Sequence, residues 1–170
     1  MKGMIFIDVE RCVSCKRCKF FCAVAHTEAK NIMEVLDDPT AESRIQIEKF
    51  AGFAVPLQCH HCEGAPCVIA CPTGAIQRNS MDVPVVVDND LCVGCQTCTI
   101  VCPYGVPRLD RYQGKKIIKC DMCIDRLNQG EEPACVTACH TGALTFKFFD
   151  EISQGIQKRL TERLRLVSVD

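Results

Sequence analysis

Residues 92–103 read Cys-Val-Gly-Cys-Gln-Thr-Cys-Thr-Ile-Val-Cys-Pro, and this stretch decides the fold. Its four cysteines, Cys92, Cys95, Cys98 and Cys102, have the spacing C-x2-C-x2-C-x3-C-P. The first three can wrap three iron corners of a [4Fe–4S] cube, and the fourth corner then takes its thiolate from elsewhere. A structural zinc site uses two separated C-x2-C pairs and needs no such crowding. The spacing therefore indicates an iron–sulfur cluster.

Three more groups of four cysteines account for all 16 cysteines of the 170-residue chain. Group one has the same spacing, and groups two and four have insertions before their third cysteine. Group four alone is also compatible with a zinc knuckle, but the presence of the three other groups in the same chain favours iron–sulfur chemistry. The members are Cys12, Cys15, Cys18 and Cys22 in group one, Cys59, Cys62, Cys67 and Cys71 in group two, Cys92, Cys95, Cys98 and Cys102 in group three, and Cys120, Cys123, Cys135 and Cys139 in group four.

Composition excludes several classes of protein. The 20 basic residues against 21 acidic ones give no polycation, so nucleic acid is not an expected partner. No apolar run reaches the roughly 18 residues of a membrane span. Asp8 closes a short N-terminal apolar run, which argues against a secretory signal and therefore against a disulfide framework. We expect a cytoplasmic location, unless a signal-bearing partner carries the chain across a membrane.

The chain repeats itself around the cysteine groups. Residues 7–15 echo residues 87–95, and residues 70–76 echo residues 138–144. Each unit predicts a strand, a cysteine loop, a short helix and a second strand after Thr-Gly-Ala. The predicted strands are 4–7, 75–77, 83–87 and 143–148, and the predicted hairpin inserts are 44–50 with 53–58 and 109–112 with 116–119.

Two such units make one bacterial ferredoxin-like domain, in which the last cysteine of each motif ligates the cluster of the other. Groups two and three are 20 residues apart, whereas groups one and two are 36 residues apart. We therefore pair group two with three and group one with four. The predicted fold is α+β, with two nested 2[4Fe–4S] domains at residues 53–108 and 1–36 plus 115–149. Sequential pairing, one with two and three with four, is the alternative.

Exchange of the last cysteine within each pair gives four predicted ligand sets. His60 and His61 lie inside a C-x2-C motif, but four thiolates already suffice there, so neither is an expected ligand. The sets are Cys12, Cys15, Cys18 and Cys139 for cluster I, Cys59, Cys62, Cys67 and Cys102 for cluster II, Cys92, Cys95, Cys98 and Cys71 for cluster III, and Cys120, Cys123, Cys135 and Cys22 for cluster IV.

The motifs resemble those of four-cluster ferredoxin-type electron-transfer subunits, such as the iron–sulfur subunits of DMSO reductase and formate dehydrogenase. The resemblance spans residues 4 to about 149 and rests on residues 22–26, 59–67, 119–126 and 130–139. It implies nested pairing and a large catalytic partner, which would be a molybdenum or tungsten enzyme, a CO dehydrogenase or a hydrogenase. Two positions depart from the pattern, because Ala23 and His140 stand where proline is expected. We expect His140 to be solvated or hydrogen-bonded.

Residues 150–170 fall outside the ferredoxin pattern and predict an amphipathic helix, with Asp150 as a candidate N-cap. We expect the helix to pack on its own domain or to dock onto a partner subunit or a second copy. Its apolar stripe consists of Ile152, Ile156, Leu160, Leu164 and Val167.

The predicted function is the relay of single electrons through four [4Fe–4S] clusters, between a catalytic subunit of an anaerobic redox complex and another carrier. No P-loop, dinucleotide fingerprint or catalytic triad is visible. Four oxidised clusters with their thiolates change the formal net charge from −1 to about −9. A free-standing polyferredoxin and a zinc-rich interaction module are the alternative functions.

Overall fold

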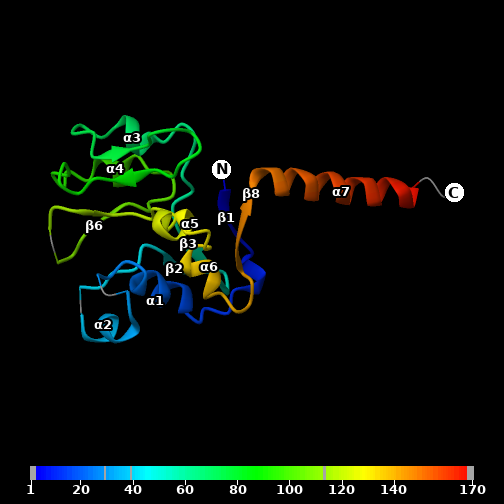
Figure 1. Ribbon diagram of the computed structural model, residues 1–170, viewed down its shortest axis with the longest axis horizontal. Helices are drawn as coiled ribbons and strands as arrows, with labels where there is room; N and C mark the ends of the chain where they lie inside the picture. Colours follow the sequence, from blue (N-terminus) through cyan, green and yellow to red (C-terminus); the bar gives the residue numbers. More distant parts are fainter. Residues whose placement is uncertain (1–2, 29, 39, 113, 168–170) are drawn as a thin grey trace.

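The computed structural model describes residues 3–28, 30–38, 40–112 and 114–167 (Figure 1). Within them, short helices alternate with four antiparallel strand pairs, β1–β8, β2–β3, β4–β5 and β6–β7, which agrees with the predicted α+β class. The elements are β1 (Gly3–Ile7), a 3-10 turn (Val9–Arg11), α1 (Arg17–Val24), α2 (Ile32–Asp37), β2 (Gln46–Phe50), β3 (Phe53–Leu57), α3 (Pro66–Ile69), β4 (Ile76–Gln77), β5 (Val86–Val87), α4 (Thr97–Ile100), β6 (Arg108–Leu109), β7 (Ile117–Ile118), α5 (Ile124–Asn128), α6 (Ala134–Thr137), β8 (Leu144–Phe148) and α7 (Phe149–Val167).

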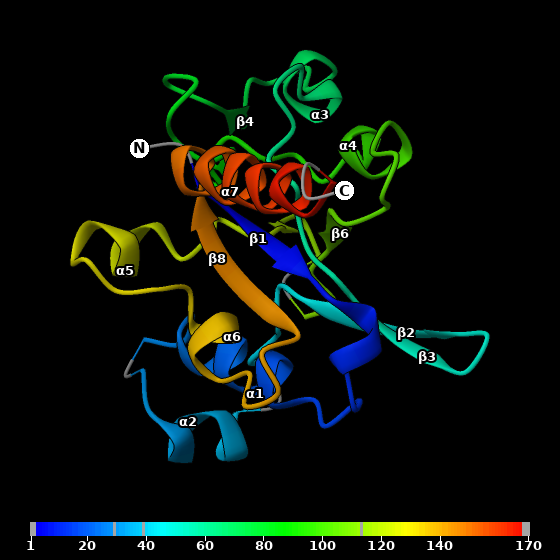
Figure 2. The same ribbon diagram turned by 90° about the vertical axis from the view of Figure 1, so that its right-hand side faces the viewer.

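The first strand pairs with the last one, so the two ends of the cysteine-bearing region close on each other (Figure 2). Strand β1 lies antiparallel to β8, with Ile5 opposite Phe146. Gly3 lets the Phe146 ring pack over the start of β1, because a Cβ there would force the ring to shift. Helix α1 of group one packs against α6 of group four. The apolar core of this part consists of Ile5, Ile45, Met122, Val136 and Leu144, with Cys18, Cys22 and Cys135.

Groups two and three lie together in the lobe drawn at the top of Figure 1. Their strands β4 and β5 pair through Ile76 and Val87, and their helices α3 and α4 contact each other. A second apolar core lies beneath them and contains Ala65, Cys67, Ile76, Val85, Cys98 and Ile117. Each core therefore mixes aliphatic side chains with cysteines.

The predicted strands and hairpins are confirmed, with shorter bounds in places. Strands β2 and β3 form the first hairpin insert, and Gly52 turns it with a φ of +85° that favours glycine. The second insert is reduced to β6 and β7, and Gln113 of its predicted turn lies outside the described residues. Helix α2 was not predicted, and it is only six residues long.

Helix α7 begins at Phe149, directly after β8, and extends away from the body (Figure 1). The predicted N-cap is wrong, because Asp150 lies inside the first turn and the Glu151 carboxylate accepts a hydrogen bond from the Phe148 N–H. Ile152 is half-buried, whereas Ile156 and Leu160 are 53% and 56% exposed, so these two stripe residues do not pack on their own domain. The side chains of Leu164 and Val167 lie outside the described residues. None of the described helices has the length and apolar character of a membrane span.

Candidate metal centres

All 16 cysteines lie in the described part of the chain, and each is a free thiol. The loops that carry them are held by short-range contacts that the repeats share. The Asp8 carboxylate accepts from the Glu10 N–H at 3.1 Å, and the Asp88 carboxylate accepts from the Asp90 N–H at 3.0 Å. These turns hold equivalent cysteine loops in the same conformation.

Cys139 of group four lies within electrostatic reach of the group-one thiols. Burial raises the pKa of Cys18 to about 11, and the charges of Cys12, Cys139 and Cys15 contribute to the increase. Three of these four residues come from one loop and the fourth from the far end of the chain. The structure thus brings together the residues predicted for cluster I.

Cys22 of group one lies in turn among the group-four thiols. Burial raises the pKa of Cys135 well above its ordinary value, and the charges of Cys120, Cys22 and Cys123 add to this effect. All four thiols of this set are buried, with 5% to 9% of each residue exposed. This is the set predicted for cluster IV, and it is the most enclosed of the predicted sets.

The lining of one small cavity includes the four residues predicted for cluster II, Cys59, Cys62, Cys67 and Cys102. Burial raises the pKa of Cys67, and the charges of Cys59 and Cys102 raise it further. The cavity also receives His61, whose Nδ1 accepts from the Val85 N–H at 3.0 Å. The neutral ring therefore carries its proton on Nε2, which is buried without a hydrogen-bond partner in the described structure.

Cys71 lies within electrostatic reach of Cys95 in group three, as the set predicted for cluster III requires. A hydrogen bond from the Thr97 hydroxyl lowers the pKa of the exposed Cys95 thiol, and the Cys71 charge opposes this. Cys98 lies deeper, and burial raises its pKa. This set therefore resembles the group-one set, with one exposed thiol and one buried thiol in each loop.

Backbone N–H groups point at the cysteine sulfurs in several of these loops. The Arg44 N–H donates to Cys22 Sγ at 3.3 Å, the Met122 N–H to Cys120 Sγ at 3.3 Å, and the Leu144 N–H to Cys139 Sγ at 3.4 Å. Such bonds favour the thiolate form, which is the form that binds metal. Converging thiols, amide donors aimed at sulfur and an orphaned imidazole donor fit a [4Fe–4S] group.

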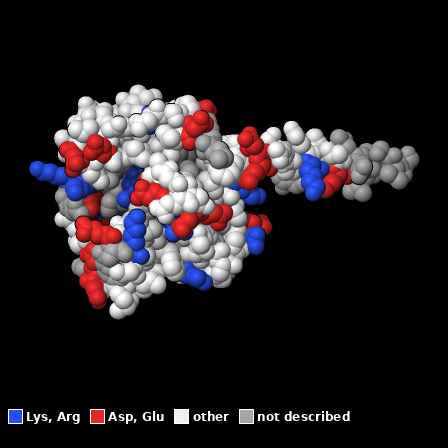
Figure 3. Space-filling view, viewed as in Figure 1, with Lys and Arg blue, Asp and Glu red and all other residues white. Residues whose placement is uncertain are grey.

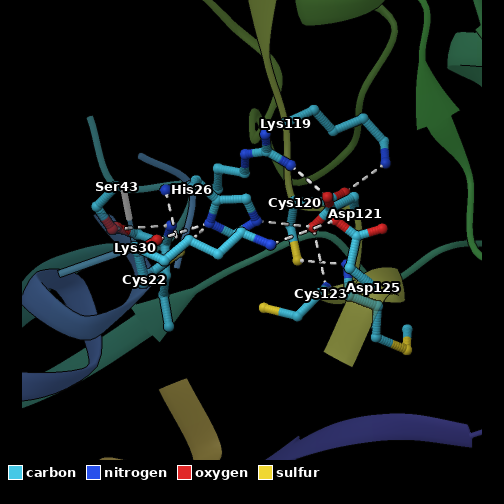
Figure 4. Close-up of polar contacts among 12 residues, drawn as sticks. Cys22, His26, Lys30, Ser43, Lys119, Cys120, Asp121, Cys123 and Asp125 are labelled. Atoms are coloured by element: carbon cyan, nitrogen blue, oxygen red, sulfur yellow. Dashed lines mark hydrogen bonds and ion pairs between the residues drawn. The ribbon is translucent and has the colours of Figure 1, made fainter. Parts of the chain in front are cut away.

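A charged network surrounds the buried set (Figure 4). His26 donates from Nδ1 to the Cys22 carbonyl oxygen at 2.6 Å and from Nε2 to the Asp121 carboxylate at 3.1 Å. The Arg44 guanidinium binds the other carboxylate oxygen at 2.5 Å. Burial opposes protonation of His26, but hydrogen bonds to Asp121, Cys123 and Cys22 raise its pKa well above the ordinary value. This network fixes the loops that present Cys22 and Cys123.

Lys119 is a buried cation between the two lobes. It is 3% exposed, and its Nζ donates to the Val85 carbonyl oxygen at 2.6 Å and to the Cys120 carbonyl oxygen at 2.7 Å. Burial raises the pKa values of Cys67 and Cys120, and the Lys119 charge opposes that increase at both thiols. Lys119 therefore acts on the thiols of both lobes.

The roles of Asp121 and Arg44 were missed at the sequence level. The position of Asp121 inside a cysteine motif was an available signal, whereas Arg44 lies in the 44–50 insert, away from any cysteine in the sequence. Charge alone does not distinguish a buried network from a solvated surface. His26 has a structural role, because its ring joins the Cys22 carbonyl oxygen to the Asp121 carboxylate. His140, expected to be solvated or hydrogen-bonded, lies with Nδ1 4.0 Å from Cys15 Sγ in an exposed contact.

Comparison with known proteins gives a family and relatives. The sequence profile of the 4Fe-4S dicluster domain matches residues 50–148. A subunit of the anaerobic dimethyl sulfoxide reductase of Escherichia coli K12 is 35% identical over 153 residues, which cover 86% of this chain and 74% of that protein. The thiosulfate reductase electron transfer subunit PhsB of Salmonella typhi is 38% identical over 155 residues, covering 85% of this chain and 74% of that protein.

Solved structures include a subunit of the active site complex BamBC of benzoyl coenzyme A reductase with bound benzoyl-CoA. It is similar over 94% of this chain and 89% of that subunit, with 22% sequence identity and a TM-score of 0.44.

Proposed function

The chain belongs to the 4Fe-4S dicluster domain family, and from that premise we propose that it is the electron-transfer subunit of a reductase complex, with four [4Fe–4S] clusters in two nested domains. Residues 1–36 plus 115–149 form one domain and residues 53–108 form the other. The observation that carries this proposal is that Cys22 and Cys139 each lie near the cysteines of the other's group. Each lies within electrostatic reach of the thiols of the opposite group, as an exchange of last cysteines requires.

The four ligand sets are those predicted from spacing. They are Cys12, Cys15, Cys18 and Cys139 for cluster I, Cys59, Cys62, Cys67 and Cys102 for cluster II, Cys92, Cys95, Cys98 and Cys71 for cluster III, and Cys120, Cys123, Cys135 and Cys22 for cluster IV. When bound, such clusters supply one-electron oxidation and reduction. The chain's own residues hold them as thiolates, donate amide hydrogen bonds to sulfur and exclude water from the buried set.

The ligand sets follow one another in the order I, IV, II, III. Three electrostatic contacts between sets support this order: Cys135 with Cys18, Cys120 with Cys59, and Cys98 with Cys67. The two terminal sets each contain one exposed cysteine, Cys15 or Cys95, and the two interior sets contain none. Electrons therefore enter and leave at the loops around Cys15 and Cys95.

The catalytic partner is a reductase subunit, as the names of the relatives indicate for those proteins. A molybdenum or tungsten enzyme is the partner class we favour over a CO dehydrogenase or a hydrogenase. Helix α7 is the docking element, because its exposed Ile156 and Leu160 lie on a helix that extends away from the body. Isolation of the native complex followed by mass spectrometry identifies the partner, and purification as a lone chain would favour a free-standing polyferredoxin.

Metal analysis and one pair of variants test the centres. Anaerobically purified protein is expected to hold about 16 iron atoms per chain, whereas a zinc module would hold about four zinc ions. In Cys22→Ser, nested pairing predicts an altered EPR signal from the buried cluster IV, and sequential pairing predicts an altered cluster II. Cys71→Ser is the matched variant, with cluster III altered under nested pairing.

A further inference from the structure

The two loops that expose a cysteine have the same backbone conformation at equivalent positions. Loop one, defined as residues 8–20, and loop three, defined as residues 88–100, both begin with an aspartate turn and end in a short helix. Lys16 and Gln96 occupy equivalent positions with φ of +61° and +60°, and both loops hold their second cysteine exposed. Differences in what the loops bind must therefore come from side chains.

The side chains of the two loops differ in charge. Loop one contains Asp8 and Glu10 against Arg11, Lys16, Arg17 and Lys19, which gives a formal charge of +2. Loop three contains Asp88 and Asp90 and no basic residue, which gives −2. At equivalent positions, Leu91 replaces Arg11, Gln96 replaces Lys16, Thr97 replaces Arg17 and Thr99 replaces Lys19. The cations are therefore not needed to build the loop.

The loop-one cations are available for a partner. Arg11, Lys16 and Arg17 are exposed, and none of the ion pairs found among the described residues involves them or Lys19. Lys16 and Lys19 also line a groove of about 590 Å³ together with Arg111. Arg108 lines the same groove but is bound to Glu42 at 2.6 Å, so it is already neutralised.

A negatively charged partner meets repulsion from thiolate-bound clusters at either end of the chain. At loop one the basic side chains oppose that repulsion. At loop three the two aspartates add to it, and the exposed Lys115, whose backbone lies against Gly94, offsets only one of their two charges. We propose that loop one docks a redox protein with an acidic surface, and that loop three does not. This inference rests on the proposed electron-transfer function and adds the charge class of the partner at the Cys15 end.

The test uses an acidic flavodoxin as the probe, with binding to the full-length, cluster-loaded protein measured by calorimetry across a series of NaCl concentrations. Wild-type protein is expected to bind with an affinity that falls as salt rises, because exposed charges are screened within about 10 Å at 0.1 M. The double variant Lys16→Gln with Arg17→Thr carries the residues of loop three and is expected to bind about tenfold more weakly.

Two controls separate a local effect from total charge. Lys147→Gln with Lys158→Gln removes two exposed cations elsewhere and is expected to change the affinity less than twofold. Gln96→Lys with Thr97→Arg gives loop three the cations of loop one and is expected to create a second flavodoxin site. Absence of wild-type binding, salt-independent binding, or equal losses in both charge-removal variants would overturn the inference.

Iron content and EPR spectra of the same samples keep the two proposals distinguishable. A preparation with about 16 iron atoms per chain that binds no flavodoxin contradicts only the docking inference. A preparation without iron contradicts the proposed function itself. Unchanged iron content in the loop-one variant shows that weakened binding does not come from a lost cluster.

Discussion

Two cysteine sets of the same predicted chemistry differ most in their surroundings. The interior set, Cys22, Cys120, Cys123 and Cys135, is wholly buried, whereas the end set, Cys71, Cys92, Cys95 and Cys98, has one buried and one exposed member. Burial raises the pKa of Cys135, and a hydrogen bond from Thr97 lowers that of Cys95. Burial therefore opposes the thiolate form at Cys135 of the interior set, whereas at Cys95 of the end set a local hydrogen bond favours it.

Substitution of a cysteine ligand should have the largest effect on iron content and structure, and that effect should differ between the two sets. Cys135→Ser leaves a poorer ligand in a buried core, so we expect loss of the cluster together with the fold around β1 and β8. Cys95→Ser changes an exposed ligand, so we expect loss of at most about four iron atoms with the rest of the protein intact. Iron content and far-UV circular dichroism measure both outcomes. Equal retention of iron and structure in the two variants would contradict the comparison.

The second largest effect is expected on stability, when the charged network of His26, Arg44 and Asp121 around the interior set is broken. In Asp121→Asn, the carboxylate that binds His26 and Arg44 is lost, and we expect a destabilisation of about 2 kcal/mol, or about 4–8 °C in the apparent Tm of the loaded protein. The control is Asp125→Asn, because its ion pair with Lys30 is long, at 3.9 Å, and exposed. There we expect less than about 0.5 kcal/mol. A comparable loss of stability in Asp125→Asn would contradict a special role for the network.

Lys119 provides a third and smaller effect. Lys119→Met removes a buried positive charge near Cys67 and Cys120, which makes addition of an electron less favourable. We expect the midpoint potentials of clusters II and IV to fall by on the order of 50 mV, as for one charge at an effective dielectric constant of about 20. EPR-monitored redox titration measures this shift. Exposed Lys49→Met should leave the potentials within error, and clusters I and III serve as internal references.

Truncation of α7 should have the smallest effect on either set. Deletion of residues 155–170 removes exposed Ile156 and Leu160 but keeps Glu151 and its hydrogen bond to the Phe148 N–H. We expect unchanged iron content and a Tm within about 2 °C of the full chain. Native mass spectrometry of the complex should then reveal lost assembly. A large fall in iron content would instead show that α7 supports the clusters.

Local features of the fold were predictable because they depend on neighbours in sequence. The Thr-Gly turns, the hairpin at Gly52 and the strands beside each cysteine group follow from residue type and alternation. The N-cap of α7 was mispredicted because β8 continues directly into the helix and leaves no room for a separate cap. The contacts of Asp121 with His26 and Arg44 join residues that are 95 and 77 positions apart in the sequence, which no local pattern encodes.

The sequence by itself determined the chemistry, since four complete groups of cysteines at iron–sulfur spacing leave no thiol unused. It also determined that loop one is basic and loop three acidic, because charge is a property of residue type. Only the tertiary structure decided which thiols are buried, that Lys119 lies between the lobes and that α7 extends from the body. The surface view shows acidic and basic side chains mixed over the face in view, without a large patch of one sign (Figure 3). Spacing fixes what a short loop can reach, whereas burial depends on how β1 and β8 close the chain upon itself.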